Sequence, residues 1–310
     1  MSKTASASDM LSAPQAETSR ETSVSAVIEE ISRSLASAGL PGGERNASAI
    51  IAALLGVSRT WPILNRNAPL PKDIPARARA AVSKLVAGAP FGYAVSSSQF
   101  RHLDLFVDER VLIPRPETEV LIDEVLNAVS SRFGPEQYWG TAVDIGTGSG
   151  AIALSIASEG KFEKVIATDI SRDAIAVAQF NAERSAASLK CPVEFRCGSL
   201  ISPVRGERVT ALISNPPYIA FSEIAALPAS VRDWEPPLAL LAGNDGMSAI
   251  AQIIAEGGEI LVSGGILALE VDERRASLAA ELAMANGAYA EIRVRLDLAG
   301  RERFVLASKI

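Results

Sequence analysis

The sequence contains few of the cysteine and histidine residues on which several large enzyme classes depend. It contains two cysteines, Cys191 and Cys197, which are not spaced as a C-x-x-C pair, and a single histidine, His102. A disulfide framework or a metal site is therefore not expected. A Ser-His-Asp hydrolase would have to use that one histidine. The cysteine usage fits a reducing cytoplasm.

The 310 residues also contain no apolar run near the ~18 residues that suggest a membrane helix, and no basic start followed by an apolar block of the kind found in secretory signals. We therefore expect a cytoplasmic protein that binds no membrane, and a monomer. Hydrophobic residues make up 48% of the chain and charged residues 21%, which is typical of soluble globular proteins. The length predicts two domains.

A basic surplus, which proteins that bind nucleic-acid phosphates usually carry, is also missing, because the net charge is −6. The charge is unevenly distributed: residues 24–100 carry a net +4 and residues 101–310 a net −9. Ordinary surface variation explains this asymmetry about as well as a function does. We do not expect nucleic acid to be the direct substrate, although the basic segment could offer a local patch.

The first third of the chain predicts a tail and a small helical domain. Residues 1–23 are rich in Ser, Thr and Ala, which is typical of a disordered tail. Within residues 24–98, apolar positions such as Val27, Ile31 and Leu35 recur at helical spacing. No chemical motif appears within this segment.

A β-hairpin linker is predicted over residues 99–114. Leu103, Leu105 and Val107 alternate with polar residues, and an apolar run, 111–113, resumes after two acidic residues. Two prolines then end the pattern, and residues 115–310 form the predicted catalytic domain.

Strand-like and helix-like segments alternate from residue 141 onward. This alternation predicts an α/β fold with a doubly wound, mostly parallel sheet that is covered on both faces. The last segment, residues 290–310, reads as two strands around Ala299-Gly300 with no room for a helix. It predicts an antiparallel hairpin at the edge of the sheet.

A glycine-rich loop, "DIGTGSG" at residues 144–150, lies between the first strand and the first helix of this alternation. Its glycines allow a sharp turn and a close approach to a ligand. Asp169, at the end of the next strand, can accept hydrogen bonds from the two hydroxyls of a ribose. The pattern predicts a nucleoside-type cofactor. Its G-x-G-x-G spacing differs from the G-x-G-x-x-G of dinucleotide sites and resembles the first motif of S-adenosylmethionine-dependent methyltransferases.

The apolar strand at 209–214 ends in Asn215-Pro216-Pro217-Tyr218. The carboxyl end of such a strand faces the ligand in an open α/β sheet. An amide nitrogen is a poor nucleophile, because its lone pair is delocalised. The side-chain carbonyl of Asn215 and the backbone carbonyl of Pro216 could hold its N–H groups and so direct it. Tyr218 could stack on the planar substrate group, and the prolines would keep the oxygens in place.

The segment "VLIPRPETEVLI", residues 111–122, narrows the choice of substrate. Together with "NPPYI", "WEPPLALLAGNDGM" and "DLAGRERFVLA", it resembles the protein-(glutamine-N5) methyltransferases that modify peptide chain release factors. The resemblance covers residues 90–310. It implies a seven-stranded methyltransferase sheet joined to a small helical domain by a hairpin. It also implies S-adenosylmethionine as cofactor, S-adenosylhomocysteine as product, and the glutamine of a Gly-Gly-Gln loop in a release factor as the acceptor.

The resemblance also implies roles for individual residues. Asn215, Pro216 and Tyr218 would be catalytic, and with Pro217 they would bind the substrate amide. Arg115 and Glu117 would support the site, and Ser199 stands where the family usually has an acid. The residues implied to bind the cofactor are Gly146, Thr147, Gly148, Ser149, Gly150, Asp169, Leu200 and Asn215.

Glu270, at the end of "ILALE", is interpreted as a buried, hydrogen-bonded residue rather than a catalytic one. Three alternatives to this function stay open at the level of sequence. The acceptor could be another protein, a nucleic-acid amine or a small-molecule amide. The chain could instead be a cofactor-binding scaffold without turnover. A nicotinamide dehydrogenase is the most distant alternative.

Overall fold

The computed structural model describes residues 22–40 and 43–310, so most of the predicted tail lies outside the described residues. The chain divides into two compact units, one up to Ala78 and one from Arg79 onward. Each unit is described by itself. The partition into a helical domain (24–98), a linker (99–114) and a catalytic domain (115–310) stays a prediction.

The first unit is helical, as predicted. Its helices are α1 (Val24–Ser37), α2 (Gly43–Leu55), α3 (Trp61–Leu64) and the start of α4 (Ile74–Val86). The Ser23 hydroxyl accepts a hydrogen bond from the Ala26 N–H and so caps α1. Val27, Ile31 and Leu35 are buried, which confirms the apolar face predicted from their spacing.

The β-hairpin exists, but its strands are not the predicted ones. β1 (Ser98–Phe100) pairs antiparallel with β2 (Leu103–Leu105), and residues 106–115 form no strand. The strand ends after Leu105 because the side chain of Asn181 binds both backbone groups of Phe106, at 2.7 Å to its N–H and 2.9 Å to its carbonyl. Asp108 then accepts a hydrogen bond from the Arg110 N–H at 3.1 Å, which closes a local turn in place of the second strand.

The seven-stranded sheet has the predicted architecture, with the strand order β5-β4-β3-β6-β7-β9-β8. The first five strands in this order are parallel, whereas β9 runs antiparallel to both β7 and β8. Its strands are β3 (Thr141–Ile145), β4 (Lys164–Asp169), β5 (Val193–Cys197), β6 (Val209–Ser214), β7 (Leu261–Glu270), β8 (Tyr289–Leu296) and β9 (Glu302–Lys309).

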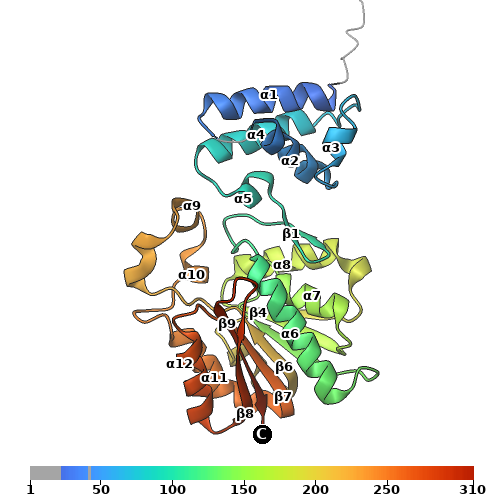
Figure 1. Cartoon of the computed structure of the whole chain (residues 1–310). Helices are drawn as coiled ribbons and strands as arrows, with labels where there is room; N and C mark the ends of the chain where they lie inside the picture. The colour runs from blue at the N-terminus through green and yellow to red at the C-terminus, as the bar shows by residue number, and fades with distance from the viewer. Residues whose placement is uncertain (1–21, 41–42) are drawn as a thin grey trace, which may run out of the picture. The chain divides into compact units, whose positions relative to one another are not determined.

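Helices cover both faces of this sheet (Figure 1). The helices of at least eight residues in this part of the chain are α6 (Pro116–Phe133), α7 (Ala151–Glu159), α8 (Arg172–Arg184), α11 (Ser248–Ile260) and α12 (Ala276–Asn286). The shorter ones are α5 (Phe91–Val95), η1 (Ala186–Ser188), η2 (Ser202–Val204), η3 (Phe221–Ala226), α9 (Ala229–Arg232) and α10 (Pro237–Leu240).

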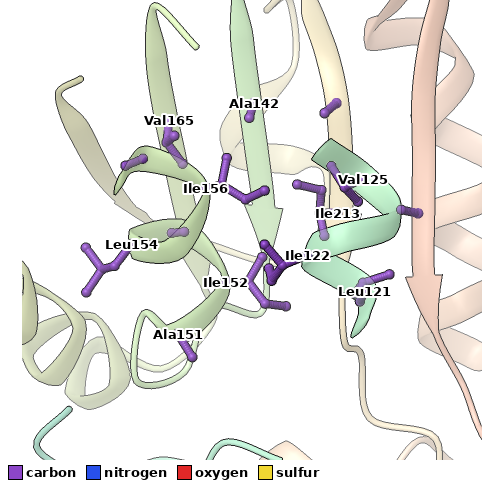
Figure 2. Close-up of a cluster of buried hydrophobic side chains, with 14 of the residues drawn as sticks. Leu121, Ile122, Val125, Ala142, Ala151, Ile152, Leu154, Ile156, Val165 and Ile213 are labelled. Atoms are coloured by element: carbon purple, nitrogen blue, oxygen red, sulfur yellow. The ribbon is translucent and has the colours of Figure 1, made fainter. Parts of the chain in front are cut away.

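The hydrophobic core consists of two layers because successive strand residues point to opposite faces. Ala142 belongs to a cluster that includes α6 and α7, and its neighbour Val143 to a cluster that includes α11 and α12. Figure 2 shows the first layer, in which Ile122 of α6 and Ile156 of α7 lie over Ala142 and Ile213 of the sheet. Among the described residues, no helix combines the length and apolar character needed to span a membrane.

Candidate functional site

The candidate site lies at the carboxyl ends of the parallel strands, where the chain order of the sheet reverses. β3, β4 and β5 build the sheet in one direction, and β6 and β7 extend it on the other side of β3. Ligands of open α/β sheets bind at such a switch point. The glycine loop follows β3 and Asn215 follows β6, so the two predicted motifs flank this point.

The glycines of the loop adopt left-handed backbone conformations that favour glycine. Gly146 has φ 74°, Gly148 φ 54° and Gly150 φ 86°. Gly150 also allows close helix packing, because a Cβ there would lie 3.3 Å from the Cβ of Ala178 on α8. At Gly146 and Gly148 a Cβ would meet nothing within 4 Å. The backbone of these two residues therefore borders open space.

Thr147 and Ser149 alternate with these glycines and point into the protein. Both are buried, and the Thr147 hydroxyl donates to the Asp144 carboxylate at 2.7 Å. The same carboxylate oxygen accepts the Ala153 N–H at 3.1 Å, so Asp144 fastens the loop to α7. Burial raises the pKa of Asp144 to about 7.

Asp169 holds the loop from the neighbouring strand. Its carboxylate accepts hydrogen bonds from the Gly148 N–H and the Ser171 N–H, both at 2.9 Å. Burial raises the pKa of Asp169, and these backbone donors oppose the rise. A carboxylate has about four acceptor positions, and backbone N–H groups of Gly148, Ser171 and Ile170 use up to three of them, so Asp169 keeps acceptor capacity for a hydroxyl group of a ligand.

A first cavity of about 320 Å³ lies beside this loop. Five of the eight predicted cofactor-binding residues line it: Gly146, Gly148, Asp169, Leu200 and Asn215. Leu200 has φ 44°, a left-handed conformation that costs a non-glycine residue energy and is concentrated at functional sites. Ser199, the residue in place of the usual acid, lines the cavity too. Thr147, Ser149 and Gly150 do not.

A second cavity, of about 560 Å³, lies beside the first. Pro216, Pro217 and Tyr218 line it. Asn215 and Pro217 line both cavities and form a shared wall. Burial raises the pKa of the Tyr218 phenol to about 12, so this ring is neutral over the physiological range. The Asn-Pro-Pro-Tyr corner thus separates a space beside the glycine loop from a space beside a neutral aromatic ring.

Sequence reasoning missed several residues of these walls. Leu112 and Ala239 line both cavities, and Ser248 and Gln252 of α11 line the first. Leu112 and Ala239 lie in two segments that carry the family resemblance, residues 111–122 and "WEPPLALL". The resemblance did not imply a role for either residue. No local pattern marks Ser248 or Gln252.

The two predicted supporting residues have different environments. Arg115 lines the second cavity and forms an ion pair with Glu235, with 2.6 Å between Nη2 and Oε2. The Glu235 side chain is 1% exposed, whereas that of Arg115 is 33% exposed. Glu117 pairs with Arg301 at 3.4 Å and lines neither cavity. Arg115 therefore lines the second cavity with its guanidinium held by Glu235, and Glu117 lies outside both cavities.

Replacing Arg115 with alanine should destabilise the protein by about 2–3 kcal/mol at pH 8, because it leaves a buried carboxylate unpaired. Burial already raises the pKa of Glu235, and loss of Arg115 removes the charge that opposes this rise. A raised carboxyl pKa gives stability that is present at low pH and is lost as the pH rises through that pKa. The difference from the parent should therefore shrink at pH 5. Urea unfolding at both pH values measures it.

The double variant Arg115→Ala/Glu235→Gln is the matched control, since its buried side chain carries no charge. It should recover most of the stability at pH 8. An equal loss in the single variant at pH 5 and pH 8 would contradict the role of the ion pair.

Comparisons with known proteins agree with this geometry. Residues 120–227 match the methyltransferase small domain family, and residues 26–95 match the PrmC N-terminal domain. The hMettl16 catalytic domain, solved in complex with a 3′UTR hairpin, has the same fold, with a TM-score of 0.54 and 16% identity over 84% of this chain and 90% of that chain. The sheet and the family matches define a methyltransferase.

Curated relatives specify the family further. The release factor glutamine methyltransferase of Moorella thermoacetica is 38% identical over 90% of this chain and 95% of its own length. That of Deinococcus radiodurans is 37% identical over 89% of this chain and 94% of its own length. The chain belongs to the family of release factor glutamine methyltransferases.

Proposed function

We propose that this chain transfers a methyl group from S-adenosylmethionine to the side-chain amide nitrogen of a glutamine in the Gly-Gly-Gln loop of a peptide chain release factor. The observation that carries the proposal is the shared wall: Asn215 lies between the cavity beside the glycine loop and the cavity beside Tyr218. The named activity of the curated relatives supports the same acceptor.

The first cavity fits the proposed cofactor. Open space beside Gly146 and Gly148 leaves room for a ligand against bare backbone. The carboxylate of Asp169 keeps acceptor capacity for a ribose hydroxyl, and Leu200 offers an apolar surface for a flat base. Thr147 and Ser149 would contribute to cofactor binding only by holding the loop in its conformation, since their side chains are buried. When bound, S-adenosylmethionine supplies a methyl carbon activated by a sulfonium.

The chain's own residues would direct the acceptor nitrogen. The Asn215 Oδ1 and the Pro216 carbonyl accept its two N–H groups, so its lone pair is held in line with the methyl carbon. Tyr218 packs against the planar amide as a neutral ring. The methyl group would pass from the sulfonium sulfur to this nitrogen, and the cationic amide would then release a proton to water. The gain in rate would come from orientation and electrostatics, and a general base before transfer is not needed.

Residues 24–98 are proposed to recognise the protein substrate. Their net charge of +4, against −9 for residues 101–310, gives the two parts different electrostatic surfaces. The family match at 26–95 supports a role shared with the relatives. An intact release factor should therefore be methylated faster than a short peptide that carries the same Gly-Gly-Gln sequence.

Methyl-labelled cofactor and purified release factor test the proposed activity. The label is expected on the glutamine of the Gly-Gly-Gln loop, located by peptide mapping, and a release factor with that glutamine replaced by alanine should stay unlabelled. Label on a different acceptor from a cell lysate, with none on the release factor, would overturn the proposed substrate. Cofactor binding in calorimetry without transfer to any acceptor would point to a scaffold without turnover.

A further inference from the structure

Two buried side chains, Thr118 and Glu270, form a hydrogen-bonded chain with Asn215 of the shared wall. The Asn215 Nδ2 lies 3.2 Å from the Thr118 Oγ1, which lies 2.7 Å from the Glu270 Oε2. Thr118 and Glu270 are 4% and 1% exposed, and neither lines either cavity. The interpretation of Glu270 as a buried, hydrogen-bonded residue is confirmed. Of these three residues, only Asn215 lines the two cavities.

The positions of the protons determine the direction of the Asn215 amide. A threonine hydroxyl carries one proton, and an ionised carboxylate can only accept. The Thr118 hydroxyl therefore donates to Glu270 and accepts from the Asn215 N–H. The reversed amide would place its Oδ1 against an oxygen whose proton is already used. With Nδ2 directed at Thr118, the Oδ1 on the opposite side of the planar amide is turned away from this pair.

We propose that Thr118 and Glu270 are positioning residues that fix the direction of the Asn215 amide. The oxygen of this amide, and not its nitrogen, is then presented to the N–H of the substrate amide. The inference rests on the proposed function, which requires a hydrogen-bond acceptor at this point of the wall. Asn215 is the residue that touches the substrate, and Thr118 and Glu270 act through it.

Protonation of Glu270 would release this constraint. A neutral carboxyl can donate to Thr118, whose own proton then becomes free to bind the Asn215 Oδ1, and the reversed amide becomes possible. The charged and titratable groups that face Glu270 are Glu117 on α6, Tyr218 after β6 and Arg303 on β9. Burial and Glu117 raise the pKa of Glu270, while Thr118, Arg303 and Asn215 oppose the rise, and the result is about 7.

Two substitutions of Thr118 test the hydroxyl. Thr118→Val keeps the shape without the hydroxyl and should lower kcat about 10- to 100-fold, with the KM for the release factor and the Kd for S-adenosylmethionine changed less than about threefold. Thr118→Ser restores the hydroxyl and should recover most of kcat. Thr141→Val, another buried threonine at the far end of β3, controls for the loss of a hydroxyl in the core. An undiminished kcat in Thr118→Val would overturn the proposal, as would a proportional loss of cofactor affinity.

The pH profile tests Glu270. The parent should lose kcat as the pH falls from 8 to 6, because protonated Glu270 no longer fixes the amide. Glu270→Gln has no proton to gain, so its profile should lack this step. Asp144 also titrates near pH 7, and the informative quantity is therefore the difference between the two profiles. An unchanged step in Glu270→Gln would overturn the role of Glu270, and this comparison holds even if Thr118→Val fails to fold.

A readout without turnover separates this inference from the proposed function. In the full chain labelled with ¹⁵N-asparagine, the Asn215 side-chain amide is the resonance that Asn215→Ala removes. Its protons should exchange slowly and shift with pH near 7 in the parent, and should exchange faster in Thr118→Val. This result, together with no transfer to a release factor, would reject the substrate and keep the positioning role. Fast exchange without a pH shift in the parent would reject the positioning role.

Discussion

Replacing Asn215 with alanine is expected to lower kcat about 100- to 1000-fold, with a change of less than about threefold in the Kd for S-adenosylmethionine. Alanine removes the oxygen that would accept the substrate N–H, and the acceptor nitrogen then samples directions that do not point at the methyl carbon. The cofactor keeps the loop glycines and Asp169, which are held by their own hydrogen bonds. Single-turnover transfer and calorimetry measure the two quantities separately.

Asn127→Ala is the matched control, since Asn127 is exposed on α6 and lines neither of the two cavities of the site. It should behave as the parent in both measurements. Equal losses of kcat and of cofactor affinity in Asn215→Ala would show instead that Asn215 mainly shapes the cofactor pocket.

Replacing Gly148 with valine is expected to weaken S-adenosylmethionine binding about 100-fold, or ~2.7 kcal/mol. Gly148 has φ 54°, which a β-branched residue rarely adopts. The new side chain would also enter the open space that borders the first cavity. Isothermal calorimetry of the folded variant measures the change.

Gly206→Val is the control that distinguishes backbone strain from obstruction of the cofactor cavity. Gly206 has φ 84° and open space around it, but it lines neither cavity of the site. Its valine variant should lose stability while its cofactor affinity stays within about twofold of the parent. If both variants weaken binding equally, general strain rather than the loop explains the effect.

The sheet could be predicted from sequence because its signals are local. Buried parallel strands are short apolar runs, such as 209–214, and most of them are separated by helical patterns, one of which begins at a cap residue, Ser171 before α8. The hairpin after α5 was predicted one strand too late. Its end is set by Asn181, 75 residues away, and no pattern within residues 99–114 indicates that partner.

In the candidate site too, features set by local sequence could be predicted, and features set by distant residues could not. Asn215 and the loop glycines could be predicted because proline restricts the backbone at its own position and glycine permits conformations that other residues avoid. The inward direction of Thr147 depends on Asp144, which is itself held by the Ala153 N–H of α7, so the motif alone could not show it. Thr118 lies in the middle of a recognised segment, but its partner Glu270 is 152 residues away. A role that depends on two distant residues appears only once the fold brings them together.

The position of β9 has a consequence for the order in which the protein folds. β8 pairs only with β9 within the sheet, and β9 lies between β8 and β7. β8 therefore joins the sheet only through β9, which inserts beside β7, where Phe304 pairs with Glu270. The strand that carries Glu270 stays an open edge until that insertion. The buried environment of this carboxylate is thus completed by the last strand of the sheet, and partly folded chains lack the full support of the Asn215 amide.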